Sequence, residues 1–247
     1  MNRSTDPRRP GVKRVAIIQS NYIPWKGYFD IINLVDEFVL YDDRQYTRRD
    51  WRNRNLIKTD QGLRWLTIPV RAKGRFDQRI DETMIDDPTW ANRHWKSIQH
   101  AYSGASHFHA YRDAIGNLYS HHAEERLSDV NRRFLETIAR MLEIETKLTW
   151  STDYNAEGDR TARLVSLCRQ AGAGEYLSGP AARAYIDESQ FESAGIELLY
   201  MDYSGYPEYP QQHGAFAHGV SILDLLFNTG PEARRFMKSF GAGVAPS

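Results

Sequence analysis

The sequence predicts an α/β protein with a parallel-sheet core and a mostly helical insertion. Two short apolar runs, at 14–20 and 37–41, are rich in β-branched residues, which is typical of strands buried on both faces. A loop at 21–28 and a helical stripe of apolar residues at 29–35 separate them. Strand, loop, helix and strand in this order indicate a βαβ unit, in which the two strands are parallel.

The later elements follow from the same periodicities. The segment 88–148 is expected to be mostly helical, because apolar residues repeat on one helical face at Leu135, Ile138, Ala139 and Leu142. The remaining expected elements are a strand at 62–70, a helix at 160–171, strands at 175–178 and 196–200, a Pro- and Tyr-rich loop at 203–212, and a final helix at 221–227.

Length and composition place these elements in one catalytic domain. With 247 residues, we expect a single α/β domain at 14–240 and disordered segments at 1–13 and 241–247. The N-terminal segment lacks the apolar stretch of a signal peptide, and no apolar run approaches the roughly 20 residues that span a bilayer. A lone cysteine, Cys168, excludes a disulfide within the chain. The expected location is therefore cytoplasmic.

The charge balance limits the class of ligand. Lysine and arginine together number 32, as do aspartate and glutamate, so the formal net charge is zero. A neutral chain has no overall field that would hold a long nucleic acid. A small anionic substrate remains compatible with this composition, provided that cations cluster locally. A homo-oligomer is equally compatible with it.

The first candidate site is the loop between the first strand and the first helix. Backbone N–H groups at such a helix N-terminus commonly face anions. Amide, amine and aromatic side chains gather there, and we predict that they bind substrate, with Lys26 also catalytic: Gln19, Asn21, Tyr22, Trp25, Lys26 and Tyr28. The alternative is a structural loop whose aromatic rings fix the helix.

The second candidate site follows the second strand. Asp42 and Asp43 come directly after it, and Gln45 and Tyr46 follow closely. Ligands of open parallel sheets bind beyond the carboxyl ends of the strands. We therefore predict that the two carboxylates are catalytic, as a general base or by orienting a hydroxyl, and that Gln45 and Tyr46 bind substrate. Simple capping of the turn is the alternative.

The third candidate site is the arginine-rich segment 44–58. The guanidinium fork matches a phosphate or carboxylate in two parallel hydrogen bonds, so Arg52 and Arg54, with Asn53 between them, are predicted to bind the anionic part of a substrate. A solvated surface strand or hairpin is the alternative interpretation.

Further candidates lie in the second half of the chain. Ser178 and Gly179 stand between a predicted strand and a helix and are suited to binding a ligand, and Ser151 begins a segment suited to capping or binding at a strand end. His213, in the long loop region, is the best candidate for an acid/base histidine. The histidines lack the spacing of a zinc site, so no metal site is predicted.

Several blocks of the sequence resemble one family. The blocks are 19–30, 42–46, 53–58, 176–181 and 221–231, and they occur in the order found in the WbqC-like protein family. The resemblance extends over about 15–235. That family takes its name from a bacterial O-antigen cluster, so the resemblance implies a role in polysaccharide biosynthesis, in making or decorating glycans or related small metabolites.

A weaker similarity concerns the fold. The order of strand, proline-containing loop, helix and strand is similar to the nucleotide-binding layout of nucleotidylyltransferases and pantothenate synthetases. The two histidines of their HxGH motif would correspond to Trp25 and Tyr28. Loss of both imidazoles argues against ATP chemistry, although Lys26 and the arginines offer replacement positive charge.

Three functions are consistent with these observations. The first is a small-molecule transferase that moves an acyl or aminoacyl group to an activated sugar or an amine. The second is an ATP-dependent ligase or a nucleotidylyltransferase-like enzyme, with ATP and Mg²⁺ as its cofactors, which release of pyrophosphate would distinguish. The third is a non-catalytic nucleotide-sugar-binding protein.

Overall fold

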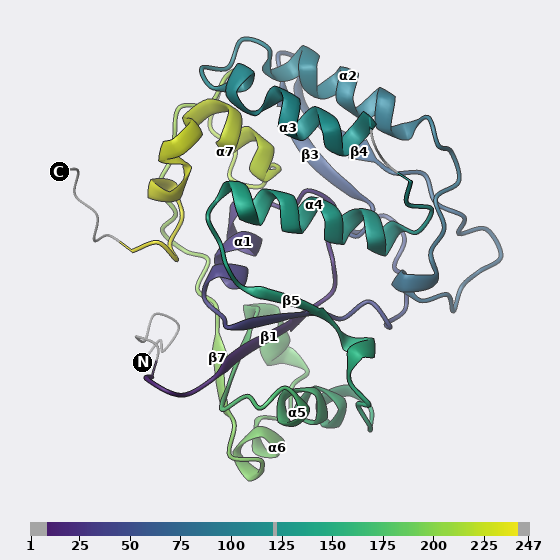
Figure 1. Ribbon diagram of the computed structural model, residues 1–247, viewed down its shortest axis with the longest axis vertical. Helices are drawn as coiled ribbons and strands as arrows, with labels where there is room; N and C mark the ends of the chain where they lie inside the picture. Colours follow the sequence, from purple (N-terminus) through teal and green to yellow (C-terminus); the bar gives the residue numbers. More distant parts are fainter. Residues whose placement is uncertain (1–8, 121–122, 242–247) are drawn as a thin grey trace.

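A five-stranded parallel sheet forms the centre of the protein in the computed structural model, which describes residues 9–120 and 123–241. The strand order is β5-β2-β1-β6-β7 (Figure 1). The strands are β1 (Arg14–Ile18), β2 (Glu37–Leu40), β5 (Lys147–Trp150), β6 (Glu175–Ser178) and β7 (Glu197–Tyr200). The predicted α/β class with a parallel sheet is thus confirmed.

The chain builds this sheet outward from β1 in two directions. It adds β2 and β5 on one side and then β6 and β7 on the other. In order of appearance the strands therefore run 3-2-1-4-5, as in the first five strands of the doubly wound dinucleotide-binding fold. Ile18 pairs with Leu40 and Leu40 with Trp150, so the segments after these strands emerge at one edge.

Each face of the sheet has its own core. Helices α1 (Lys26–Asn33) and α4 (Leu127–Met141) cover one face, and α5 (Arg160–Gln170) and α6 (Glu188–Ser193) cover the other (Figure 1). Successive strand residues point to opposite faces. Accordingly, the first core receives Ala16, Phe38 and Leu40 and the second receives Val15, Ile17 and Val39.

A second layer covers the helices α1 and α4. It contains α2 (Trp90–Tyr102), α3 (Phe108–Ser120), α7 (Ile222–Thr229) and a hairpin of β3 (Arg54–Thr59) and β4 (Gly62–Thr67) (Figure 1). The strand predicted at 62–70 exists, but it pairs antiparallel with β3 outside the parallel sheet. Leu66 is its only buried residue, so β4 lacks the apolar faces that a central strand needs. The arginine-rich segment thus contributes a strand of a hairpin.

Short 3₁₀ helices and an irregular segment complete the fold. The 3₁₀ helices are Ile80–Glu82, Ser151–Asp153, Pro180–Ala184 and Gly230–Phe236. The predicted loop 203–212 has no helix or strand, yet Tyr206 and Tyr209 are only 8% and 7% exposed. This loop is therefore packed against the body of the protein.

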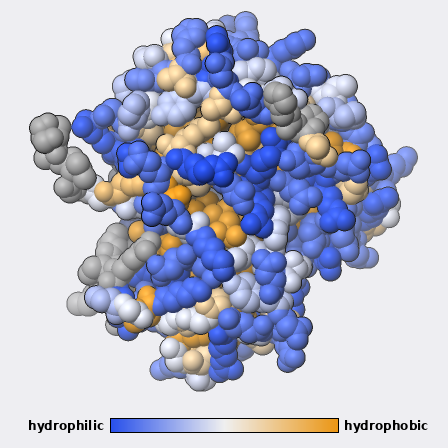
Figure 2. Space-filling view, in the orientation of Figure 1, coloured by the Kyte–Doolittle hydropathy of each residue, from blue (hydrophilic) through white to orange (hydrophobic). Residues whose placement is uncertain are grey.

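The predicted disordered segments are only partly described. Arg9 forms ion pairs with Glu175 and Glu197, the first residues of β6 and β7, so the segment before β1 contacts the amino ends of these strands. Residues 1–8 and 242–247 lie outside the described residues. Figure 2 shows a largely hydrophilic face, with apolar side chains gathered near its centre. Within the described part of the chain, no helix combines the length and apolar character needed to cross a bilayer.

Candidate functional site

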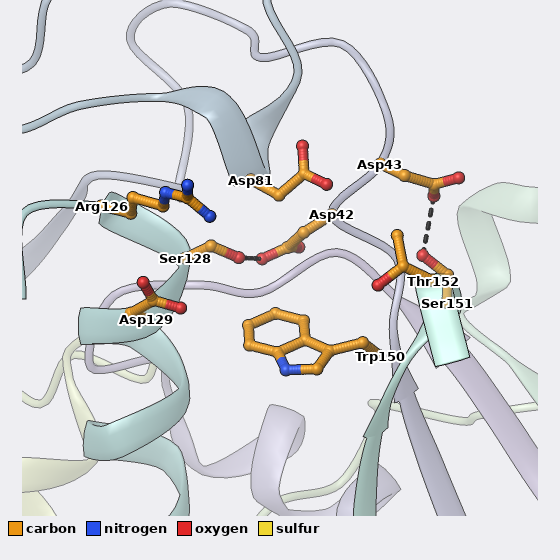
Figure 3. Close-up of a pocket in the computed structure, with 9 residues that line it drawn as sticks. All are labelled: Asp42, Asp43, Asp81, Arg126, Ser128, Asp129, Trp150, Ser151 and Thr152. Carbon is orange, nitrogen blue, oxygen red and sulfur yellow. Dashed lines mark hydrogen bonds between the residues drawn. The ribbon is translucent and has the colours of Figure 1, made fainter. Parts of the chain in front are cut away.

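A small cavity lies at the carboxyl ends of β2 and β5, where the N-terminus of α4 approaches the sheet. Its volume is about 160 Å³. Nine residues from four segments line it: Asp42, Asp43, Asp81, Arg126, Ser128, Asp129, Trp150, Ser151 and Thr152 (Figure 3). Both predicted catalytic aspartates are therefore at the edge of the sheet where ligands of such folds bind. We refer to this feature as the carboxyl-edge cavity.

Asp42 connects three parts of the fold. Its carboxylate accepts hydrogen bonds from the backbone N–H of Ser20 at 2.7 Å, from the Ser20 hydroxyl at 2.6 Å and from the Ser128 hydroxyl. The residue is only 1% exposed. Burial raises the pKa of Asp42, and the hydrogen bonds oppose this rise without cancelling it. A buried carboxylate with a raised pKa is a stronger base than an exposed one.

Asp43 has the opposite electrostatic environment. It accepts hydrogen bonds from the Ser151 hydroxyl at 2.7 Å and from Arg163 Nη2 at 2.6 Å, and Arg44 Nη2 lies 3.2 Å away. Burial alone would raise the pKa of Asp43, but the hydrogen bonds from Ser151 and the two arginines outweigh burial and lower it. This carboxylate is held in its ionised form.

The other lining residues come from distant parts of the chain. Asp81 binds the Arg79 guanidinium through both oxygens, at 2.9 and 3.1 Å. The Trp150 ring lies beneath the carboxylates in Figure 3, and Arg132 lies 5.0 Å from the centre of that ring. In the same view the guanidinium of Arg126 points toward the cavity.

Sequence reasoning missed most of these lining residues. Asp81, Arg126 and Asp129 lie in segments with no recognisable motif, and only tertiary contacts bring them to Asp42. The one useful signal was Ser151, whose position at a strand end marked it for capping or binding. In the structure its hydroxyl binds Asp43.

The loop between β1 and α1 adjoins this cavity through Ser20. Arg52 Nη1 donates to the backbone oxygens of Gln19 and Ser20, at 3.2 and 3.3 Å, and to the side-chain oxygen of Asn21. The Tyr28 hydroxyl donates to the same oxygen of Gln19 at 2.9 Å. Arg52 is therefore engaged with the loop itself, although the structure does bring it next to Gln19 and Asn21 as predicted.

One residue of this loop has a strained backbone. Ile23 has φ +36°, a region that β-branched residues rarely adopt, and its side chain is fully buried. Such strain persists only where the surroundings hold it, and it concentrates at functional sites. This observation favours a functional role for the loop.

Tyr22 points away from the cavity into the core. Its hydroxyl lies 2.9 Å from His94 Nδ1 and 2.8 Å from the Tyr119 hydroxyl, and the residue is completely buried. His94 Nε2 lies 3.1 Å from the backbone oxygen of Thr67. The structure thus gives Tyr22 a place in a buried polar cluster rather than at a surface.

Trp25 and Lys26 contact the irregular segment that follows β7. The Trp25 ring lies 5.1 Å from the ring of Tyr203 and 5.4 Å from that of Tyr206. Lys26 Nζ donates to the backbone oxygen of Pro207 at 2.8 Å and lies 5.0 Å from the ring centres of Tyr206 and Tyr209. Burial lowers the pKa of Lys26 to about 8. Lys26 does not line the carboxyl-edge cavity.

Two predicted binding residues, Gln45 and Tyr46, line a different cavity, of about 260 Å³, together with Arg48 and Arg75. The Gln45 side chain donates to the backbone oxygen of Phe76 at 2.7 Å. These residues lie beyond the first turn after β2, which carries them away from the sheet edge.

Asn53 and Arg54, which were predicted with Arg52 to bind an anion, also have local partners. The Asn53 side chain is buried and donates to the backbone oxygen of Ile68 at 2.7 Å. The Arg54 guanidinium lies 4.1 Å from the ring centre of Trp65 on the hairpin. Arg52 and Arg54 therefore do not converge on one point.

The predicted residues of the second half of the chain are divided between two places. Ser178 and Gly179 stand at the carboxyl end of β6, beside β1, where the direction of strand addition reverses. His213 lines a separate cavity beside β3, and its Nε2 lies 3.3 Å from the backbone oxygen of Ala101. In the described ranges 9–120 and 123–241, no three His, Cys, Asp or Glu side chains are grouped to hold a metal ion.

Comparison with known proteins shows similarity at the level of sequence. The chain is 52% identical to the uncharacterized protein Rv1507c of Mycobacterium tuberculosis over 227 residues, which cover 92% of this chain and 98% of that protein. No solved structure matches it significantly. The model of the WbqC-like protein family matches residues 19–236, which include every lining residue of the carboxyl-edge cavity. The chain therefore belongs to the WbqC-like protein family.

Proposed function

We propose that this protein transfers an acyl or aminoacyl group to a hydroxyl or amine of a small sugar-bearing metabolite held in the carboxyl-edge cavity. The observation that carries the proposal is the lining of this cavity by four carboxylates and one aromatic ring: Asp42, Asp43, Asp81, Asp129 and Trp150. Carboxylate oxygens accept hydrogen bonds from hydroxyl and amine groups. A flat indole ring packs well against the C–H face of a sugar.

The size of the cavity limits what it holds. Its volume of about 160 Å³ is below the roughly 300–1,000 Å³ of a site for a drug-sized ligand. A single sugar ring or an amine-bearing head group fits this space, whereas a complete nucleotide-sugar does not. The diphosphate of such a substrate would remain at the rim, where Arg126 lines the cavity and Arg44 and Arg163 flank Asp43.

Asp42 is the proposed general base. A carboxylate has about four lone-pair positions, and the three donors from Ser20 and Ser128 leave one for a substrate proton. Its neighbour Asp43 is held ionised and fixes Arg163 and Ser151 at the rim. Neighbouring carboxylates whose environments differ in this way commonly divide the roles of base and electrostatic anchor. The resemblance to a family named after an O-antigen cluster also supports a sugar-bearing substrate.

The proposal is tested by binding and turnover with one set of variants. Wild-type protein is titrated calorimetrically with UDP-, GDP- and dTDP-linked amino sugars and with ATP, each with and without Mg²⁺. Mixtures with acyl-CoA and aminoacyl donors are then analysed by mass spectrometry. We expect Mg²⁺-independent binding of a nucleotide-sugar and an acylated product. Asp42→Asn should retain binding and reduce turnover by about 10²–10⁴-fold, as expected for loss of a general base.

Two further variants sharpen this test. Trp150→Leu should weaken binding of the sugar, and the exposed Asp113→Asn on α3 should change neither binding nor turnover. ATP binding that needs Mg²⁺ and releases pyrophosphate would instead support a ligase. Binding of a nucleotide-sugar that Asp42→Asn and Trp150→Leu leave unchanged would remove the cavity from the site.

A further inference from the structure

A second cavity, of about 420 Å³, lies between the β3–β4 hairpin and the irregular segment before α7. Nine residues line it: Lys58, Thr59, Asp60, Gly62, Leu63, His213, Gly214, Ala215 and Ala217. None of them lines the carboxyl-edge cavity. Its volume falls within the range of small-molecule sites. We refer to it as the hairpin cavity.

The hairpin cavity has a buried cation in its wall. Lys58 is only 4% exposed, and its Nζ donates to Gln211 Oε1 at 2.9 Å and to the backbone oxygen of Gly214 at 3.4 Å. Both acceptors are neutral. Within the described part of the chain, no carboxylate lies within ion-pair distance of this Nζ. Asp224 acts on the Lys58 charge only from beyond ion-pair distance, so an anion placed beside the ammonium group would gain a direct, charge-assisted hydrogen bond.

Lys58 is held in place by a chain of buried hydrogen bonds. Gln211, its acceptor, donates to the Tyr209 hydroxyl at 3.1 Å, and Tyr209 donates to Asp224 Oδ1 at 2.8 Å. The Tyr102 hydroxyl donates to Asp224 Oδ2 at 2.9 Å and accepts from the Lys58 backbone N–H at 3.1 Å. This closed network fixes the ammonium group before a ligand arrives, which reduces the entropy cost of binding.

His213 stands at the same cavity in an unusual backbone conformation. Its φ is +64° and that of Gly214 is +67°, so the chain turns sharply at the rim. His213 Nε2 faces the backbone oxygen of Ala101, whereas Nδ1 has no hydrogen-bond partner among the residues that the structure describes. Leu63, 53% exposed, and Ala217 add apolar surface to the wall.

We infer that the hairpin cavity binds a small organic anion. Its carboxylate or phosphate binds Lys58 Nζ and the imidazole of His213, and its carbon skeleton lies against Leu63 and Ala217. A carboxylate and a phosphate would bind the ammonium group of Lys58 in the same way. The experiment therefore compares ligands that carry one or the other. This site is independent of the function proposed for the carboxyl-edge cavity.

The test is an NMR and calorimetric titration of the full-length protein at constant ionic strength. The probes are succinate, glycerol 3-phosphate and inorganic phosphate, with chloride as the nonspecific anion. We expect one organic anion to shift the His213 imidazole resonances saturably, with chloride having no effect. Lys58→Met should weaken this binding at least tenfold, and the exposed Lys96→Met on α2 should not.

A second variant covers the case in which Lys58→Met disturbs folding. Leu63→Glu places a carboxylate at the cavity without changing Lys58 or its network, and it should also weaken binding while leaving the Tm unchanged. A stronger response to succinate identifies a carboxylate ligand, and one to glycerol 3-phosphate a phosphate. Absence of a saturable shift with every probe, or equal affinity in Leu63→Glu and wild type, overturns the inference.

Discussion

His94 illustrates how burial determines the behaviour of a single residue. Both of its ring nitrogens face hydrogen-bond partners, Tyr22 and the backbone of Thr67, and the residue is 6% exposed. Burial lowers the pKa of His94 to about 4, well below its ordinary value of 6.5. The folded protein therefore keeps this imidazole neutral in the pH range where the unfolded chain takes up a proton.

This difference predicts an acid-sensitive stability. Because the unfolded state binds more protons between pH 6.5 and 4, the contribution of His94 is complete above 6.5 and is lost as the pH falls toward 4. Between pH 6.5 and 5 the free energy of unfolding should fall by about 1.6 kcal/mol, because the slope reaches its limit of about 1.36 kcal/mol per pH unit only well below pH 6.5. Urea unfolding at several pH values measures it. His94→Gln should flatten the profile, whereas the exposed His100→Gln should not; equal slopes in all three proteins would contradict the assignment.

At the scale of elements, the junction of β1, α1 and the 203–212 loop depends on one glycine. The ring of Trp25 packs directly over Gly27, the second residue of α1. The same ring also contacts the rings of Tyr203 and Tyr206. A Cβ at position 27 would lie 2.4 Å from Trp25 Cζ2. The absence of a side chain at Gly27 thus allows the indole to connect the helix with the loop.

Gly27→Ala is therefore expected to displace Trp25. Overpacking of this kind costs about 1–3 kcal/mol, which outweighs the gain of up to about 1 kcal/mol from higher helix propensity. Urea unfolding should show the lower stability, and hydrogen exchange should rise in the 203–212 loop. Gly219→Ala is the matched control, since its Cβ would meet no atom within 4 Å. A Gly27→Ala protein as stable as wild type, with unchanged exchange, would disprove the role of this contact.

At the scale of the whole molecule, the two edges of the parallel sheet differ in chemistry. The carboxyl edge carries the candidate site. The amino edge carries ion pairs with buried carboxylates: Arg14 Nε binds Glu175 at 2.6 Å, and the partly exposed Lys13 Nζ binds Glu37 at 2.8 Å. Arg14 and Glu175 begin adjacent strands and are 5% and 2% exposed. The hydrogen bonds to arginine outweigh burial and lower the pKa of Glu175.

Breaking the buried pair should be far more costly than breaking a surface pair. Arg14→Met leaves the buried Glu175 carboxylate with only the half-exposed Arg9 as an ionic partner, and is expected to cost up to about 3–5 kcal/mol. Arg14→Met with Glu175→Leu should recover much of this loss, because no buried charge remains. Arg93→Met removes the exposed pair with Asp87 and should lower the free energy of unfolding far less. Urea unfolding of the variants measures these differences, and a purely additive double mutant would show that the two residues are not coupled.

The class of most elements could be predicted from local sequence, but β5 was not, because it begins within the segment 88–148 that was expected to be mostly helical. Runs such as 14–18 and 37–40 are apolar on both faces, and that pattern requires two covering layers wherever the strands lie in the fold. β3 was recognised only as an alternative, because its Arg54, Asn55 and Lys58 disrupt an apolar pattern and acquire their partners from other segments.

What the sequence determined by itself was the parallel α/β core, the family blocks and the place of Asp42 and Asp43 at a strand end. These follow from short-range periodicity and from the rule that parallel strands end at one edge. Only the tertiary structure decided that Asp81, Asp129 and Trp150 join those aspartates, and that Lys26 and His213 do not. The physical reason is that contacts between distant segments depend on strand order and helix packing, which no local pattern encodes.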